Sequence, residues 1–141
     1  MIGETRILAI DFGEKRIGTA ISDPLKIIAQ PFEMIANDQQ CFPRLTAIME
    51  EKQIEKIVLG FPYRDDGAET VVTEKIRIFK KELEKRFNLP VILVDESFSS
   101  SIAADRVQQS IPKKMKRRDK SLLDIHAAVV ILEDYLRNNY S

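Results

Sequence analysis

The stretch RILAIDFGEKRIGTAISDP, residues 6–24, decides the fold class of this 141-residue sequence. Its apolar run at 7–10 has the composition of a buried strand, yet the strand ends in a carboxylate, Asp11. Gly13 permits a turn, and residues 16–22 predict a second strand that runs back along the first. The stretch therefore predicts a hairpin with an acidic side chain at the end of its first strand.

Beyond this hairpin, the hydrophobic pattern alternates between the strand period and the helix period. Strands are predicted at 26–35, 56–60 and 91–95, and helices at about 45–53, at 72–87, shortly after 99–101, and at 121–137. Pro31 confines the first of these strands to a sheet edge or requires a bulge. The order predicts an α/β fold, in which a mixed sheet carries helices on its faces.

Length and composition favour one domain. The sequence has 141 residues, 44% of them hydrophobic, so we expect residues 1–141 to form a single domain around one core. No apolar stretch reaches the roughly 18 residues of a membrane span, and Asp11 interrupts the N-terminal run, which argues against an anchor or a secretory signal. The single Cys41 excludes an internal disulfide and a cysteine-based metal cluster. We therefore expect a cytoplasmic protein.

The charge is balanced overall but unevenly distributed. Residues 113–120, KKMKRRDK, hold six of the 22 cations and one of the 22 anions. We call its cations up to position 118 the basic cluster: Lys113, Lys114, Lys116, Arg117 and Arg118. Such a run is typical of a solvated loop, and it is also typical of a surface that binds the phosphates of a nucleic acid.

Three carboxylates are candidates for a shared site. Asp11 and Glu96 directly end or follow predicted strands, and Asp124 lies in the first turn of the last predicted helix. Ligands of open α/β sheets bind outside the carboxyl ends of the strands. Clustered carboxylates need a cation, and their hard oxygen atoms suit Mg²⁺ or Mn²⁺, which can support phosphodiester cleavage.

Each acid also has a structural interpretation. Asp11 could cap the turn before Gly13, because aspartate is favoured in turns. Asp124 and Ser121 form an S-x-x-D pair that resembles a capping box. Asp95 competes with Glu96, because consecutive strand residues face opposite sides of a sheet.

Other polar residues have two interpretations as well. Lys15 and Arg16 could solvate the hairpin turn or hold the phosphates of a bound strand beside Asp11. His126 lies about 200° around the predicted helix from Asp124, so we expect a structural or solvent-facing role and not a general base. The loop at 60–67 follows a buried strand and could shape the same rim.

Four motifs resemble those of a known family. They are AIDFGEKRIGTAISDP, VLGFPYRDDGAE, VDESFSS and DIHAAVVIL, and they span nearly the whole chain. In order and spacing they resemble the motifs of the YqgF/RuvX family of ribonuclease-H-like proteins, described as Holliday-junction resolvases and as nucleases that mature the small-subunit ribosomal RNA precursor. The resemblance implies a ribonuclease-H-like fold with a five-stranded mixed sheet, and a catalytic acid triad at Asp11, Glu96 and Asp124. The family usually has Arg, Leu and Thr after the second acid, whereas Ser97, Phe98 and Ser99 stand here.

The leading hypothesis is a nuclease that depends on Mg²⁺ or Mn²⁺ and acts on nucleic acid, with RNA favoured over DNA. Asp11, Glu96 and Asp124 would hold the metal, while Lys15, Arg16 and the basic cluster would hold phosphates. An alternative is a nucleic-acid-binding factor without catalysis, in ribosome assembly or transcription. A second alternative is an actin-like ATPase, because AIDFGEKRIG also resembles the first phosphate loop of that class, although such proteins need two domains to enclose a nucleotide. A junction resolvase would need two active sites and hence a dimer, and the sequence shows no obvious dimer surface.

Overall fold

The computed structural model describes residues 4–63, 69–96 and 120–140, with the side chains of 120–124 excepted. Its elements are β1 (Arg6–Asp11), β2 (Arg16–Ser22), β3 (Ala29–Ala36), α1 (Cys41–Glu51), β4 (Ile54–Phe61), α2 (Val71–Phe87), β5 (Val91–Asp95) and α5 (Lys120–Tyr140). The predicted helix after 99–101 and the basic cluster lie outside the described residues. None of the described helices combines the length and apolar character that a membrane crossing requires.

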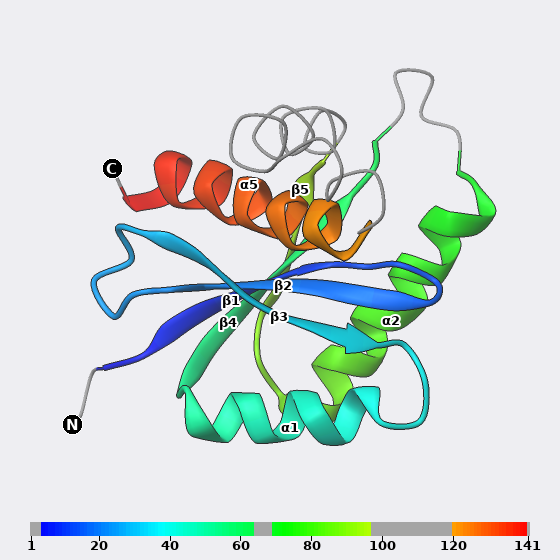
Figure 1. Cartoon of the computed structure of the whole chain (residues 1–141), viewed down its shortest axis with the longest axis horizontal. Coiled ribbons are helices and arrows are strands. Elements are labelled where there is room, and N and C mark those ends of the chain that lie inside the picture. The colour runs from blue at the N-terminus through cyan, green and yellow to red at the C-terminus, as the bar shows by residue number, and fades with distance from the viewer. Residues whose placement is uncertain (1–3, 64–68, 97–119, 141) are drawn as a thin grey trace.

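The strands form one mixed sheet in the order β3-β2-β1-β4-β5. β1 pairs with β2, and β2 with β3, in antiparallel fashion, whereas β1 with β4 and β4 with β5 are parallel. This topology confirms the predicted α/β fold with a five-stranded mixed sheet. It also brings the carboxyl ends of β1, β4 and β5 to the same edge of the sheet, which we call the carboxyl edge (Figure 1).

Two apolar layers cover the two faces of the sheet (Figure 1). On one face, residues of α1 and α2 such as Leu45 and Phe79 pack against Leu8 and Ile10 of β1. On the other face, α5 packs against the alternate residues of the same strand, Ile7 and Ala9. The odd-numbered residues of β1 therefore face α5, because successive strand residues point to opposite faces.

The predicted starts of β3 and α1 were wrong, each for a local reason, and β4 extends beyond the predicted 56–60 at both ends. β3 begins at Ala29 and not at 26, because the Asp23 carboxylate accepts hydrogen bonds from the backbone N–H groups of Ile27 and Ile28, both at 2.8 Å, and holds a turn. α1 begins at Cys41, before Pro43, because the first N–H groups of a helix have no intrahelical acceptor and proline loses nothing there.

The prediction for Pro31 is confirmed, and the structure adds two local features at Cys41 and at the start of α2. Pro31 lies in the edge strand β3, opposite Ala20 and beside a register shift in the pairing with β2. Cys41 is free and buried, and burial raises the pKa of its thiol to about 11. α2 begins with a reciprocal capping box between Thr70 and Thr73, which satisfies N–H groups of its first turn.

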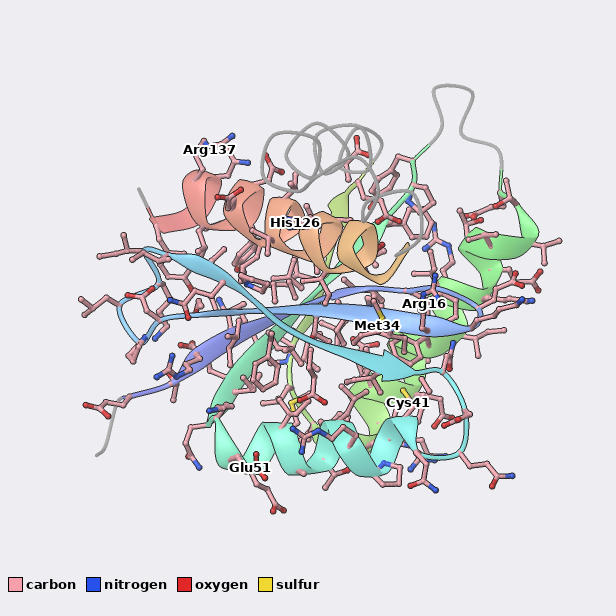
Figure 2. All side chains as sticks on the ribbon, viewed as in Figure 1. Arg16, Met34, Cys41, Glu51, His126 and Arg137 are labelled. Carbon is pink, nitrogen blue, oxygen red and sulfur yellow. The ribbon has the colours of Figure 1, made fainter. Side chains whose placement is uncertain are left out.

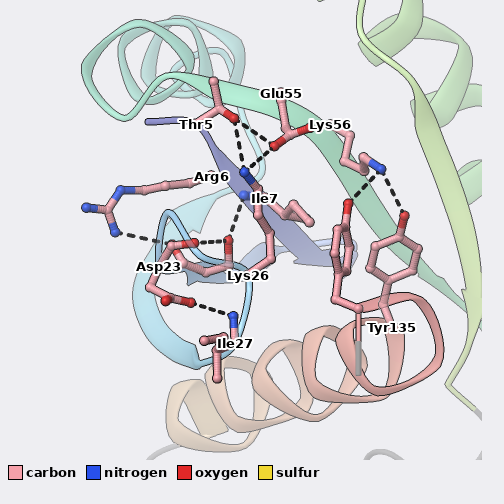
Figure 3. A network of polar contacts seen from close by, with 11 residues as sticks. Thr5, Arg6, Ile7, Asp23, Lys26, Ile27, Glu55, Lys56 and Tyr135 are labelled. Carbon is pink, nitrogen blue, oxygen red and sulfur yellow. Dashed lines mark hydrogen bonds and ion pairs between the residues drawn. The ribbon is translucent and has the colours of Figure 1, made fainter. Parts of the chain in front are cut away.

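Hydrogen bonds and an ion pair connect elements at the edge of the sheet opposite the carboxyl edge (Figure 3). Glu55 of β4 accepts a hydrogen bond from Thr5 and forms an ion pair with Lys26 of the β2–β3 turn, both at 2.7 Å. Its neighbour Lys56 donates hydrogen bonds to the hydroxyl groups of Tyr135 and Tyr140 on α5, at 3.2 and 3.0 Å. These contacts fix the C-terminal end of α5 against β4.

Candidate active site

Asp11 and Glu96 both lie at the carboxyl edge, separated by one strand. Asp11 is the last residue of β1, and Glu96 follows the last residue of β5. β4 lies between these strands, and the Glu96 N–H donates to the Phe61 carbonyl at 3.1 Å, so the backbone still follows β4 beyond the end of β5.

The alternation of side chains selects Glu96 over Asp95. Ile92 and Val94 of β5 pack in the layer of α5, so the next residue of that series, Glu96, points to the face that Asp11 shares. Asp95 occupies the alternate series and is exposed. The α5 face therefore receives the Asp11 and Glu96 carboxyl groups, one from each side of β4.

Gly60 of β4 makes room for this meeting. A β-carbon built on Gly60 would lie 2.7 Å from Oε2 of Glu96, 3.1 Å from its Cδ, and 2.5 Å from Cδ1 of Ile131 on α5. Any side chain here would occupy the space through which Glu96 reaches over β4. Sequence reasoning placed Gly60 at the end of the predicted strand 56–60 and the start of the following loop, without this role. A glycine within an apolar strand is nevertheless a known signal of a close approach.

The two carboxyl groups share a hydrogen bond, and burial shifts the pKa of Glu96. Burial raises the pKa of Glu96 above its ordinary value, the hydrogen bond with Asp11 acts in the opposite direction, and the nearby charge of Asp95 raises it further. Two carboxylates can share a hydrogen bond only when a proton lies between them. A divalent cation could replace that proton, because it would neutralise both carboxylates and accept their oxygen atoms as ligands.

α5 covers the acid pair from one side. Its residues Ala127 and Ala128 are buried, and Ile131 contacts the Gly60 position. Asp124 belongs to the same helix, one turn before Ala128, but its side chain is outside the described part of the structure. Among the described side chains, no three potential metal ligands cluster. Two of the three predicted acids are thus brought together.

The cations predicted to hold phosphates lie in part at this edge. Lys15 is exposed in the β1–β2 turn, and Arg16, labelled in Figure 2, begins β2 and is half-buried. His126 lies on α5 and is half-buried. Part of the predicted rim loop, residues 64–68, lies outside the described ranges.

Sequence reasoning missed one cation, Arg77 of α2. Its guanidinium carbon lies 4.6 Å from the ring centroid of Phe61, and Phe61 in turn contacts Tyr63 with ring centroids 4.7 Å apart. Arg77 also pairs with Glu69 at 2.8 Å. The helical pattern of α2 did not predict the contact between Arg77 and Phe61, because this contact depends on where α2 packs relative to the end of β4.

Comparison with known proteins identifies a matching family and relatives that align over most of this chain. The family described as RuvX: Holliday junction resolvase matches residues 5–138. A Maridesulfovibrio salexigens protein, described as a candidate pre-16S rRNA nuclease, is 40% identical over 133 residues, which cover 93% of this chain and 97% of that protein. A Methylobacillus flagellatus protein with the same description is 45% identical over 132 residues, which cover 92% and 88% of the two chains.

Solved structures show the same fold at low sequence identity. Fowlpox virus resolvase in complex with Holliday junction DNA has a TM-score of 0.60 and 14% identity, with 97% of this chain and 100% of that chain covered. RuvC of T. thermophilus in complex with a Holliday junction has a TM-score of 0.57 and 14% identity, with 96% of each chain covered. The fold of the chain is therefore that of the RuvC-like resolvases.

Proposed function

The chain belongs to the RuvX family of Holliday junction resolvases, and we propose that it is a metal-dependent nuclease that processes the precursor of small-subunit ribosomal RNA. The observation that carries this proposal is the meeting of Asp11 and Glu96 over Gly60. Their two strands are not neighbours in the sheet, and a glycine is needed for the contact. A turn cap or a solvated surface acid would need neither feature.

The donor set suits Mg²⁺ or Mn²⁺. Asp11 and Glu96 would ligate the ion through carboxylate oxygen atoms, and Asp124, on the helix that covers the pair, would complete the protein ligands. When bound, such an ion acidifies a water molecule and neutralises charge on the leaving oxygen. The residues of the chain provide the rest: α5 covers the pair from one side, and the carboxylates would fix the position of the ion that attracts the scissile phosphate.

Cations around the carboxyl edge would hold the substrate backbone. Lys15 and Arg16 lie beside the end of β1, Arg77 lies beside the end of β4, and the basic cluster adds further positive charge in the sequence before α5. Contacts of this kind position a nucleic acid without reading its sequence. Arg77 would substitute for the arginine that the family usually carries after the second acid, where Ser97 stands here.

The substrate assignment rests on the relatives that align over most of their length. Both are described as candidate pre-16S rRNA nucleases, and the alignments cover 97% and 88% of them. The resolvases that share the fold are only 14% identical, so their junction substrates carry less weight. Junction cleavage is the second candidate, favoured by the family description.

The test is incubation of the purified protein with labelled precursor rRNA, its DNA counterpart and a four-way junction, each with Mg²⁺, Mn²⁺ or chelator. We expect metal-dependent cleavage of the RNA that Asp11→Asn abolishes. Asp95→Asn is the matched control, because it removes the carboxylate next to Glu96 from the opposite face. Equal cleavage by Asp11→Asn and the parent protein would overturn the catalytic assignment. Binding of RNA with no cleavage under any condition would favour the non-catalytic alternative.

A further inference from the structure

A second concave site lies on the opposite face of the sheet from the acid pair. It is a pocket of about 320 Å³ between the β1–β2 turn, the start of α1 and the middle of α2. Three aromatic rings line it: Phe12 and Phe42 both contact Phe79, with ring centroids 5.0 and 5.6 Å apart. The volume is at the lower end of the range for small-molecule sites, roughly 300–1,000 Å³.

Consecutive residues of the chain belong to the candidate active site and to the pocket. Phe12 directly follows Asp11, so their Cα atoms are about 3.8 Å apart. Asp11 faces the α5 layer, whereas Phe12 packs with the residues of α1 and α2. A strand of nucleic acid bound at Asp11 would have to pass around the carboxyl edge of the sheet to reach the pocket.

The polar rim determines which part of a nucleotide can enter. Glu14 and Glu82 provide two carboxylates, and Lys75 provides one ammonium group, which pairs with Glu14 at 3.1 Å. The Asn37 amide donates a hydrogen bond to the Gly13 carbonyl at 2.8 Å and holds the turn in place. With Arg86, which pairs with Glu82, the charges of the rim balance, so no surplus cation attracts a phosphate. The rim favours a neutral group with flat apolar faces and N–H donors along its edge, which is the chemistry of a nucleobase.

The carboxylates of Glu14 and Glu82 can leave their present ion pairs with little loss of stability. The Glu14–Lys75 pair is about half exposed on both sides, and Glu82 pairs with Arg86 at 3.1 Å in an equally exposed position. Exposed ion pairs of this kind contribute little to stability, so either carboxylate can exchange its partner for an N–H group of a base.

We propose that this pocket binds one unpaired nucleobase of the substrate, around the carboxyl edge from the phosphate held at the acid pair. The proposal rests on the proposed function, because it takes the ligand to be the strand that the nuclease cleaves. Stacking against Phe12 or Phe42, whose rings are only partly buried, would fix the register of that strand, and the buried Phe79 supports both rings. The enzyme would thus require an unpaired nucleotide at a set distance from the cleaved bond.

The experiment is a binding scan with single-stranded RNA in EDTA, in which one abasic nucleotide is moved along the sequence. Stacking of one base on aromatic side chains is worth on the order of 10-fold in affinity, so the parent protein should lose about 10-fold at one position. Ile78→Glu places a charge in the pocket at a side chain that is 58% exposed. This variant should bind intact RNA about 10-fold more weakly and lose the position dependence.

Ile27→Glu is the matched control, because it makes the same substitution at a 69% exposed isoleucine near the opposite edge of the sheet. It should give the parent profile. If Ile78→Glu does not fold, Ile78→Gln serves in its place. A flat abasic profile, an absence of RNA binding, or an unchanged profile in the Ile78 variant would overturn the proposal. Cleavage of the intact RNA with Mg²⁺ is measured separately. If the abasic profile depends on position but no cleavage occurs, the proposed function is wrong and the proposal of a base pocket is supported.

Discussion

Replacing Gly60 by alanine tests whether the acid pair depends on the absence of a side chain at this position. The added methyl group would lie 2.7 Å from Oε2 of Glu96, and an ordinary contact starts at about 3.4 Å, so the carboxylate must withdraw by about 0.7 Å. Displacements on the order of 1 Å in a catalytic group can cost about 100-fold in rate. We therefore expect metal-dependent cleavage by Gly60→Ala to fall by about 100-fold.

Stability should change much less than activity. Overpacking of a core costs about 1–3 kcal/mol, but the atoms that clash here are the ends of two side chains, Glu96 and Ile131, which can turn away. Replacing glycine also removes freedom from the unfolded chain, which returns about 0.4–1 kcal/mol. The melting temperature, measured by circular dichroism, should fall by no more than about 4 °C.

A double variant separates the two contacts. Ile131→Val removes the Cδ1 atom that would lie 2.5 Å from the new methyl group, at a separate cost of about 1 kcal/mol, and leaves the contact with Glu96. The Gly60→Ala/Ile131→Val protein should therefore remain inactive. Recovery of cleavage in it would show that a shift of α5, and not of Glu96, caused the loss. Cleavage by Gly60→Ala within about threefold of the parent rate would refute the reasoning altogether.

Three further predictions concern charge. Because folding raises the pKa of Glu96, the folded protein binds a proton at Glu96 more tightly than the unfolded chain does. Without metal, the free energy of unfolding should therefore fall as the pH rises from about 4.5. Glu96→Gln should remove this fall in thermal melts that contain chelator. An unchanged pH slope in that variant would contradict the burial argument. Glu33 behaves in the opposite way: hydrogen bonds from Arg44 at 2.7 Å lower its pKa, so the pair stabilises above about pH 4.5 and loses this effect in acid. Because both side chains are about one third exposed, Arg44→Ala should lower the free energy of unfolding only slightly at pH 7 in urea titrations, and a loss that persists at pH 3 would point to packing instead. Replacing four cations of the basic cluster, at 113, 114, 117 and 118, by alanine should reduce the salt dependence of RNA binding by about 0.7 log units per lost phosphate contact, and an equal slope would remove the cluster from the interface.

Local periodicity was sufficient to predict most elements. β1, β2 and β5 have the predicted bounds, because their apolar runs are bordered by turn residues that act within a few positions. The start of β3 was not predicted, because it depends on hydrogen bonds that the backbone N–H groups of Ile27 and Ile28 donate to the Asp23 carboxylate.

The candidate site was predictable in its residue types but not in its construction. Apolar runs that end in carboxylates indicated Asp11 and the pair Asp95 and Glu96. Strand alternation left these two as alternatives, and the family resemblance selected Glu96. The need for Gly60 could not be derived, because it depends on β4 lying between two strands whose acids meet above it. Arg77 was missed for the same reason, since its position follows from helix packing.

The docking of α5 has a consequence for the order of folding. Among the described elements, α5 alone supplies the helical layer on its face of the sheet. Its contact from Tyr135 to Lys56 spans 79 residues, and contacts of such separation form late, because closing a long loop costs entropy. Until α5 docks, that face of the sheet is open to water. Because Asp124 lies on the same helix, the candidate third acid can approach the acid pair only once this layer has closed.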